Sequence, residues 1–99
     1  MEVLPNPIKE AVNRRKHRLD FSRVADVLRR PRVEVPDDRP LGYEHEARVR
    51  VYGSLGDGRV VVLVYQPVET GNGEIAARPI SLRKATRDEQ QVHWAHHHG

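Results

Sequence analysis

The run VVVLVY at residues 60–65 is the feature that most constrains the fold of this chain of 99 residues. It is apolar at successive positions and mainly β-branched, as expected of a strand that is covered on both faces. The segment LGDGR at 55–59 precedes it and contains the Asp-Gly pair of a tight hairpin turn. We therefore expect a central strand that is joined through this turn to an antiparallel neighbour.

Three further segments have the character of strands. ARVRVYG at 47–53 alternates valine with polar or aromatic residues, which predicts one buried face and one face exposed to water. ETGNGE at 69–74 is a second turn, and IAARPISLR at 75–83 returns from it, while RVEV at 32–35 is a short candidate strand. Consecutive strands that are joined by tight turns form an antiparallel meander, so we predict a four-stranded antiparallel sheet.

The segment NPIKEAVNRRKHR at 6–18 predicts a first helix. Asn6 is a suitable N-cap, Pro7 is suited to the first helical position, and basic residues follow in the last turn. The helix offers little apolar surface. We expect one narrow buried stripe, formed by Ile8, Ala11 and Val12.

Two more helices are indicated by their caps. The segment LDFSRVADVLRRP at 19–31 has Asp20 as a candidate cap and ends at Pro31. Thr86 and Glu89 stand at the spacing of a capping box, so the last helix should begin near Thr86. The fold class is therefore α+β, with two N-terminal helices, a four-stranded antiparallel sheet and a C-terminal helix.

The composition excludes several classes of protein. There is no cysteine, which excludes disulfides, a thiol nucleophile and a cysteine zinc site. No apolar run approaches the roughly 18 residues that span a bilayer, and the N-terminus lacks the pattern of a secretion signal, so we expect a cytoplasmic protein with no membrane partner. We expect a single domain over 1–95 and a histidine-rich tail over 96–99, which could bind a metal or could be a ragged end or the remnant of a tag. No metal or cofactor is expected for the domain.

Basic residues form two clusters, over 14–32 and over 78–87, in a chain whose net charge is +3. One interpretation is that both clusters are solvated surfaces of helices. The other is that the fold brings both clusters to one face of the sheet, where they would bind the phosphates of a nucleic acid.

The alternation of side chains along a strand sharpens the second interpretation. Ser81 and Arg83 should share one face, opposite Leu82, whereas Arg78 should point to the side of Leu82. Pro79 cannot donate a hydrogen bond within a sheet, so it should lie on an edge or at a bulge. A bulge at this point would bring Arg78 to the same face as Arg83.

Several motifs in this order resemble the BrnT family, the toxins of prokaryotic BrnT–BrnA toxin–antitoxin pairs. The similarity covers roughly 6–93, and its most specific parts are N-x-x-K-H at 13–17, E-x-R at 46–48 and I-S-x-R-K-A-T-x-x-E at 80–89. The resemblance implies a RelE-like fold and a ribonuclease that inhibits translation. It also implies neutralisation by a BrnA-like antitoxin with a ribbon-helix-helix part, so that operator DNA would be contacted only through the antitoxin.

The resemblance also implies site residues. Metal-independent RNA cleavage needs a base for the 2′-hydroxyl, cations for the charged phosphorane and an acid for the leaving oxygen. The matching positions are Arg83, Arg78 and Arg48 as phosphate ligands, Glu46 or His17 as the base, and Lys16, Arg15, Lys84 and Arg87 as RNA-binding residues. Other roles are open for two of them, because Glu46 could form an ion pair across strands and His17 could simply end its helix.

The chain departs from the family at several positions. Pro5 and Asn6 stand where the family commonly has Trp-Asp, and Arg18 stands where a glycine is usual. His93 replaces a tyrosine, so it could serve as the acid or could mark a loss of activity. Two roles are open for Trp94, which could stack on a base or pack the last helix against the sheet. The alternative function is therefore a catalytically degenerate toxin that acts only as a structural or nucleic-acid-binding partner of its antitoxin.

Overall fold

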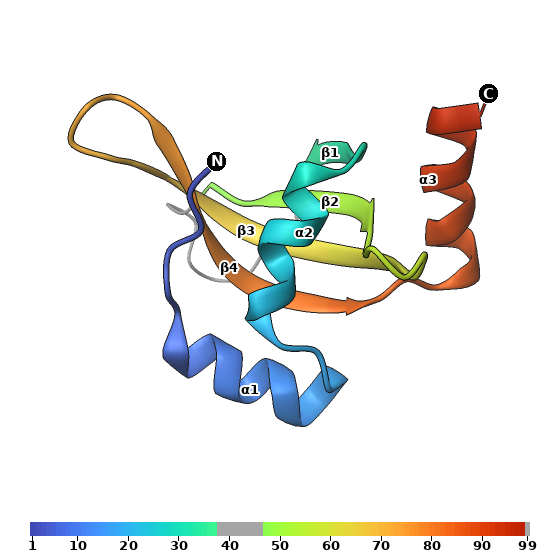
Figure 1. Ribbon diagram of the computed structural model, residues 1–99, viewed down its shortest axis with the longest axis horizontal. Coiled ribbons are helices and arrows are strands. Elements are labelled where there is room, and N and C mark those ends of the chain that lie inside the picture. The colour runs from blue at the N-terminus through green and yellow to red at the C-terminus, as the bar shows by residue number, and fades with distance from the viewer. Residues whose placement is uncertain (38–46, 99) are drawn as a thin grey trace.

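The computed structural model describes residues 1–37 and 47–98 of the chain, the last two of these by their backbone alone. A four-stranded antiparallel sheet separates α2 on one face from α3 on the other, and α1 lies at the edge of the sheet (Figure 1). The elements are α1 (Pro7–His17), a 3-10 turn (Phe21–Arg23), α2 (Val24–Arg29), β1 (Val33–Pro36), β2 (Val49–Ser54), β3 (Val60–Glu69), β4 (Ile75–Lys84) and α3 (Arg87–His98). The predicted α+β class is confirmed. No helix within these described residues has the length and apolarity that crossing a membrane requires.

The strand order is β1-β2-β3-β4, so the predicted meander is confirmed. β3 lies inside the sheet between β2 and β4, and its residues from Val61 to Tyr65 are buried on both faces. The Asp-Gly turn closes the β2–β3 hairpin, where the Leu55 N–H donates to the Arg59 carbonyl at 2.9 Å. The apolar run at 60–65 therefore forms a central strand that is buried on both faces, as its sequence predicts.

A bulge interrupts β4 opposite the middle of β3. Val64 pairs with Ser81, but Tyr65 pairs with Pro79, which leaves Ile80 as an extra residue in β4. The extra residue shifts the alternation of side chains by one position. Arg78 therefore points to the same face as Ser81, as the sequence predicts for a bulge at Pro79.

Each face of the sheet has its own core. The larger core lies between the sheet and the segment from Leu19 to Leu28, and it includes Phe21, Val24, Val27, Val51, Leu63 and Leu82. The smaller core lies under α3 and contains Tyr52, Val62 and Ala85. We expected the face that carries Tyr52 to be exposed to water, and this is wrong for Tyr52 because α3 covers it.

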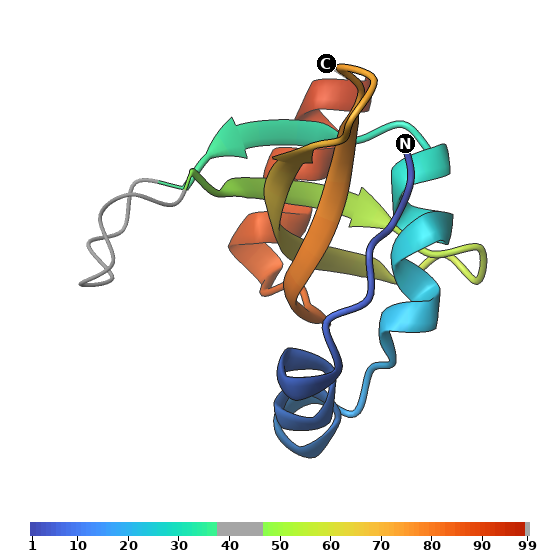
Figure 2. The same ribbon diagram turned by 90° about the vertical axis from the view of Figure 1, so that its left-hand side faces the viewer.

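The predicted apolar stripe of α1 is wrong. Ile8 is 78% exposed and Val12 is 51% exposed, whereas Asn13 is only 2% exposed. The reason is the site at which α1 docks. The helix packs against the outer edge of β4 (Figure 2), where backbone N–H and C=O groups need hydrogen-bond partners more than apolar ones.

Asn13 supplies those partners. Its Nδ2 donates to the carbonyl of Leu82 at 2.9 Å and to that of Leu19 at 3.0 Å, and its Oδ1 accepts from the Leu82 N–H at 2.8 Å. Asn6 acts in a similar way, because its Nδ2 donates to the Pro79 carbonyl at 2.8 Å instead of capping α1. Two asparagine side chains thus cover part of an edge that would otherwise be open.

The rest of that edge is covered by the N-terminal segment, which runs beside β4 (Figure 2). The Leu4 N–H donates to the Ala77 carbonyl, and the Ala77 N–H donates to the Glu2 carbonyl, both at 2.8 Å. The chain before α1 therefore forms a short parallel pairing with β4 at Val3.

Of the other two predicted helices, the one over 19–31 differs in detail from expectation. The segment after α1 is a 3-10 turn followed by α2, and the Asp20 carboxylate caps it by accepting from the Ser22 N–H at 2.8 Å. The capping box of α3 is confirmed. The Thr86 N–H donates to Glu89 Oε1 at 2.9 Å, and the Glu89 N–H donates to Thr86 Oγ1 at 3.3 Å.

Replacement of Asn13 should destabilise the fold. In Asn13→Ala the buried N–H and C=O of Leu82 lose their partners, so we expect the free energy of unfolding to fall by about 2–5 kcal/mol. Asn13→Asp should be similarly destabilising because a carboxylate cannot donate to the Leu82 carbonyl. Asn6→Ala is the matched control and should cost about 1 kcal/mol, since it removes one half-buried hydrogen bond. Equal effects of Asn6→Ala and Asn13→Ala in urea unfolding would contradict this account.

Candidate functional site

Two arginines of β4 point to the same face of the sheet. Arg83 is opposite Val62, and Arg78, beyond the bulge, is opposite Gln66. Residues paired across an antiparallel ladder project to the same side, and Val62 and Gln66 share one side of β3 because they are four residues apart. The two arginines therefore lie on the face that carries α3 at one end.

Arg48 reaches this face from the position just before β2. It lies two residues before Arg50, which is opposite Val64, so both side chains follow the same alternation. Arg48, Arg78 and Gln66 together line a hollow of about 270 Å³. Arginines from separated segments thus come together over one surface of the sheet.

Helix α1 adds more positive charge beside these arginines. A second hollow of about 170 Å³ adjoins the first at Ile80, and Lys9 lines both of them. Lys16 and His17 line the second hollow together with Ser81. We call this surface the basic face; it comprises Arg48, Arg78 and Arg83 from the sheet and Lys9, Lys16 and His17 from α1.

The surroundings of His17 favour its neutral form. Burial lowers the pKa of the imidazole, and the positive charges of Lys16 and Arg83 lower it further. A histidine with a lowered pKa is unprotonated at neutral pH and can accept a proton. A neutral imidazole has the protonation state that a general base needs.

Arg83 is bound tightly to α3. Its Nη1 and Nη2 donate to the two carboxylate oxygens of Glu89 at 2.7 and 2.8 Å. The hydrogen bond from Arg83, together with the Thr86 N–H, holds the pKa of Glu89 at about 2. Arg83 thus shares its charge with a carboxylate, whereas Arg78 is exposed and pairs with no carboxylate in the part of the chain that the structure describes.

Two of the predicted RNA-binding residues lie away from the basic face. Lys84 is opposite Val61 in the ladder, so it projects to the other face of the sheet. Arg15 is two positions from Asn13, or about 200° around α1, and it points away from β4. Side chains alternate along a strand, so Lys84 must point to the face opposite that of its neighbour Arg83. The sequence alone could therefore have excluded Lys84 from the site.

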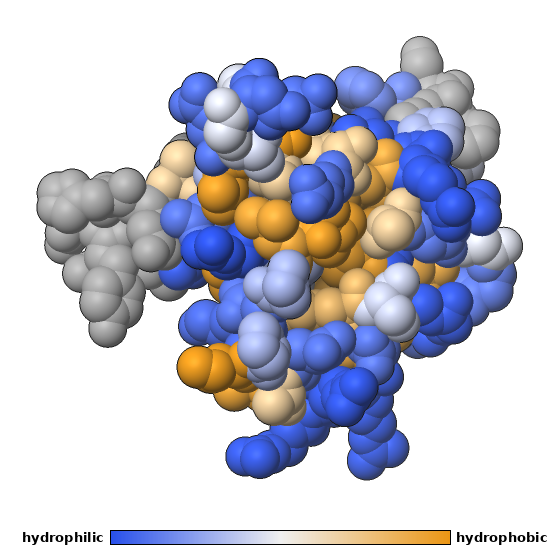
Figure 3. Space-filling model, turned by 60° about the vertical axis from the view of Figure 1, so that its left-hand side comes forward, coloured by the Kyte–Doolittle hydropathy of each residue, from blue (hydrophilic) through white to orange (hydrophobic). Residues whose placement is uncertain are grey.

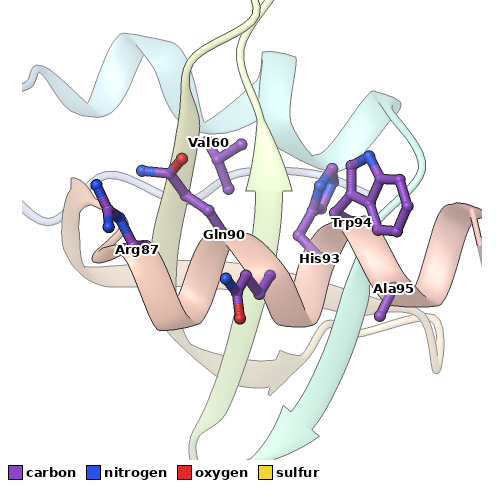
Figure 4. Close-up of a pocket in the computed structure, with 7 residues that line it drawn as sticks. Val60, Arg87, Gln90, His93, Trp94 and Ala95 are labelled. Atoms are coloured by element: carbon purple, nitrogen blue, oxygen red, sulfur yellow. The ribbon is translucent and has the colours of Figure 1, made fainter.

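Arg87, predicted to bind RNA, and His93, predicted as a candidate acid, lie on α3. Arg87 is its first residue, and both Arg87 and His93 line a hollow between α3 and the start of β3 (Figure 4). His93 is therefore not a member of the basic face. Glu46, the other candidate base, lies outside the described residues.

The sequence reasoning missed three residues near the site. Lys9 could have been found, because it precedes Lys16 by seven residues and so lies on the same side of α1. The other two are Gln66, which lines the hollow with Arg48 and Arg78, and Arg50, which lies opposite Val64 on the same face of the sheet. The Arg50 guanidinium lies 5.9 Å from the centre of the Tyr52 ring, and its Nη2 is 3.8 Å from Asp37 Oδ1.

The surface around α1 is mixed in polarity. In Figure 3 hydrophilic side chains dominate the lower part of the molecule, where α1 lies, with hydrophobic ones among them. Ile8 and Val12 are the large exposed apolar residues of this helix. Within the described part of the chain, no three side chains of histidine, aspartate or glutamate lie close enough together to hold a metal ion.

A comparison with protein families matches residues 6–89 to the family described as "Ribonuclease toxin, BrnT, of type II toxin-antitoxin system". The match includes α1, all four strands and the first turn of α3, so the basic face lies within it. A search of curated proteins finds no match.

The Arg83–Glu89 pair should stabilise the protein in a manner that depends on pH. Because the pKa of Glu89 is lowered by folding, the stabilisation that the ion pair provides is fully present at pH values above 4.5, the ordinary pKa of glutamate. This stabilisation disappears as the pH falls towards about 2. Glu89→Gln should therefore lower the free energy of unfolding by about 1 kcal/mol at pH 7 and by less at pH 3. Thermal unfolding across this range measures it, with Asp88→Asn as the control. A Glu89→Gln deficit that stays constant from pH 7 to pH 3 would contradict the assignment.

Proposed function

The chain belongs to the BrnT family of ribonuclease toxins of type II toxin–antitoxin systems, and from this premise we propose that it is itself an endoribonuclease that cleaves RNA on the basic face. The observation that carries the proposal is the convergence of Arg48 and Arg78 with Lys9, Lys16 and His17 around two adjoining hollows. Clustered cations of this kind bind the phosphates of a nucleic acid. The reaction needs no metal ion, because these side chains supply the positive charge.

The residues of the basic face fit the steps of RNA cleavage. His17, neutral near pH 7, accepts the proton of a 2′-hydroxyl while the 2′-oxygen forms a bond to phosphorus. Arg78 and Arg48 bind the oxygens of the phosphorane, whose negative charge is greatest at this point. The bond to the 5′-oxygen then breaks, and this oxygen takes a proton from water. The products are a 2′,3′-cyclic phosphate and a free 5′-hydroxyl.

Inhibition of translation and neutralisation by a BrnA-like antitoxin complete the proposal. A type II system includes a protein antitoxin, so a partner of this kind is implied by the family. We assign contact with operator DNA to the ribbon-helix-helix part of that partner. The site of action would be the cytoplasm, where messenger RNA and ribosomes are found.

A second function is supported by the state of Arg83. Both terminal nitrogens of its guanidinium are bound by Glu89, which reduces its capacity to bind a phosphate. A chain of this family that has lost catalysis could still bind its antitoxin or a nucleic acid. The two functions differ in whether RNA is cut.

An assay of RNA cleavage separates the two functions, and substitution of Arg78 tests the site. If the chain is a ribonuclease, Arg78→Ala should lower the rate of RNA cleavage by about 10²- to 10³-fold, because it removes a cation that binds the phosphorane. Lys84→Ala is a matched control that removes an exposed cation from β4 on the opposite face, and it should retain the activity. Cleavage is measured on purified RNA in the presence of a chelator. Intact RNA with the unmodified protein would establish the second function instead.

The pH dependence of cleavage tests the role of His17. The rate should rise with pH as the imidazole loses its proton, with a midpoint below the ordinary pKa of histidine near 6.5. Lys16→Met removes a neighbouring positive charge, so the pKa of His17 should rise and the midpoint should move to higher pH. Arg15→Met, which removes a cation from the far side of α1, should leave the midpoint in place. Equal midpoints in all three proteins would exclude His17 as the base.

A further inference from the structure

A third hollow lies outside the basic face, along α3. Its volume is about 620 Å³, the largest of the hollows described here, and it lies between α3 and Val60 at the start of β3. Gln90 and Trp94 project into it from successive turns of α3, and Arg87 stands at the end nearest the helix start (Figure 4). Gln91 contributes a second amide. The proposed cleavage reaction uses none of these residues.

Trp94 has an unusual position for the single tryptophan of a small protein. Its side chain is 60% exposed, although burial of an indole would remove some of the largest apolar surface that any residue offers. The core under α3 is filled by Tyr52, Val62 and Ala85 instead. The packing of α3 against the sheet therefore does not account for a tryptophan at this position.

The side chains that line the hollow are complementary to an unstacked nucleobase. Trp94 offers a flat aromatic surface and Val60 an apolar wall, which together suit a planar ring. The amide nitrogen of Gln90 donates to the Ala85 carbonyl at 3.2 Å, which leaves its oxygen and one N–H for the edge of a base. Gln91 adds a second amide donor and acceptor. Arg87 supplies a cation for the phosphate that is attached to such a base. Single-stranded RNA presents all three of these features at once.

The hollow adjoins the basic face. Val60 lies two residues before Val62 in β3, and Val62 is opposite Arg83. Arg83 and Val60 are therefore diagonal neighbours on one face of the sheet, about 7–8 Å apart, with their Cβ atoms somewhat closer. An RNA strand that crosses the basic face can pass Arg87 at the start of α3 and place a base beside Trp94, about two turns further along the helix.

We propose that the hollow formed by Trp94, Val60, Gln90, Gln91 and Arg87 binds a nucleobase of single-stranded RNA, as a subsite next to the basic face. The proposal rests on the proposed function, because it assigns the hollow to the same substrate. The family match ends at residue 89, so three of the five residues lie beyond it. The subsite is therefore a property of this chain that the family description does not supply.

The fluorescence of Trp94 tests the proposal directly, because no other tryptophan contributes to the signal. The probe is a single-stranded RNA octamer with 2′-O-methyl riboses, which binds but cannot be cleaved because it lacks the attacking hydroxyl. Stacking of a base on the indole should quench the fluorescence as the octamer is added. A 2′-O-methyl duplex of the same sequence, whose bases are already stacked, should cause little quenching.

Substitution of Trp94 gives an independent measurement, since it uses a fluorescein-labelled octamer and its anisotropy. Trp94→Ala should weaken binding about 5- to 150-fold, the range expected for loss of one stacked base, and Trp94→Phe should restore most of it. Val92→Ala is the matched control. Val92 is 46% exposed on α3 and does not line the hollow, so its loss should leave the affinity unchanged.

The outcomes distinguish this proposal from the proposed function. An octamer that binds without quenching, and equally well to Trp94→Ala, would overturn the subsite while leaving cleavage on the basic face intact. Quenching by the octamer together with an uncut cleavable RNA would overturn the ribonuclease and retain the subsite. Quenching by a co-purified antitoxin but not by RNA would assign the hollow to a protein partner and overturn the proposal.

Discussion

The position of α1 depends on the hydrogen bonds between the Asn13 side chain and the backbone of Leu82. An edge strand presents N–H and C=O groups that must find partners, and Asn13 binds both of these groups at one residue. The apolar side chains of α1 cannot fix the helix in place, because Ile8 and Val12 remain exposed. Lys9, Lys16 and His17 reach the basic face only because α1 is held at this edge.

The bulge in β4 connects this docking to the site. Asn6 bonds to Pro79 and Asn13 bonds to Leu82, three residues apart on the same outer edge. In a regular strand, outward-facing backbone groups recur every two residues, so a spacing of three requires the extra residue Ile80. The same extra residue turns Arg78 towards the face of Arg83. One local irregularity therefore determines both how the edge is covered and where the cation points.

The sequence predicts those features that depend on local periodicity. The apolar run of β3, the Asp-Gly turn, the bulge at Pro79 and the capping box of α3 all follow from short patterns, and all are present. The apolar stripe of α1 fails for a physical reason. Periodicity shows which side of a helix is apolar, but it does not show that the helix will dock on a strand edge, where hydrogen bonding outweighs apolar burial. The same limit applies to Asn6, which resembles a cap and instead binds a strand.

Arg83 has a structural contact besides the phosphate-binding role that its motif implies. A guanidinium whose two terminal nitrogens bind one carboxylate adds little net charge to a surface, so Arg83 contributes less to the positive field of the basic face than Arg78 and the lysines of α1 do. Arg83 instead attaches α3 to the end of β4. Because Leu82 and Arg83 are adjacent, β4 binds α1 through the backbone of one residue and α3 through the side chain of the next. The distance between the basic face and the hollow beside Trp94 is thus set by a single strand.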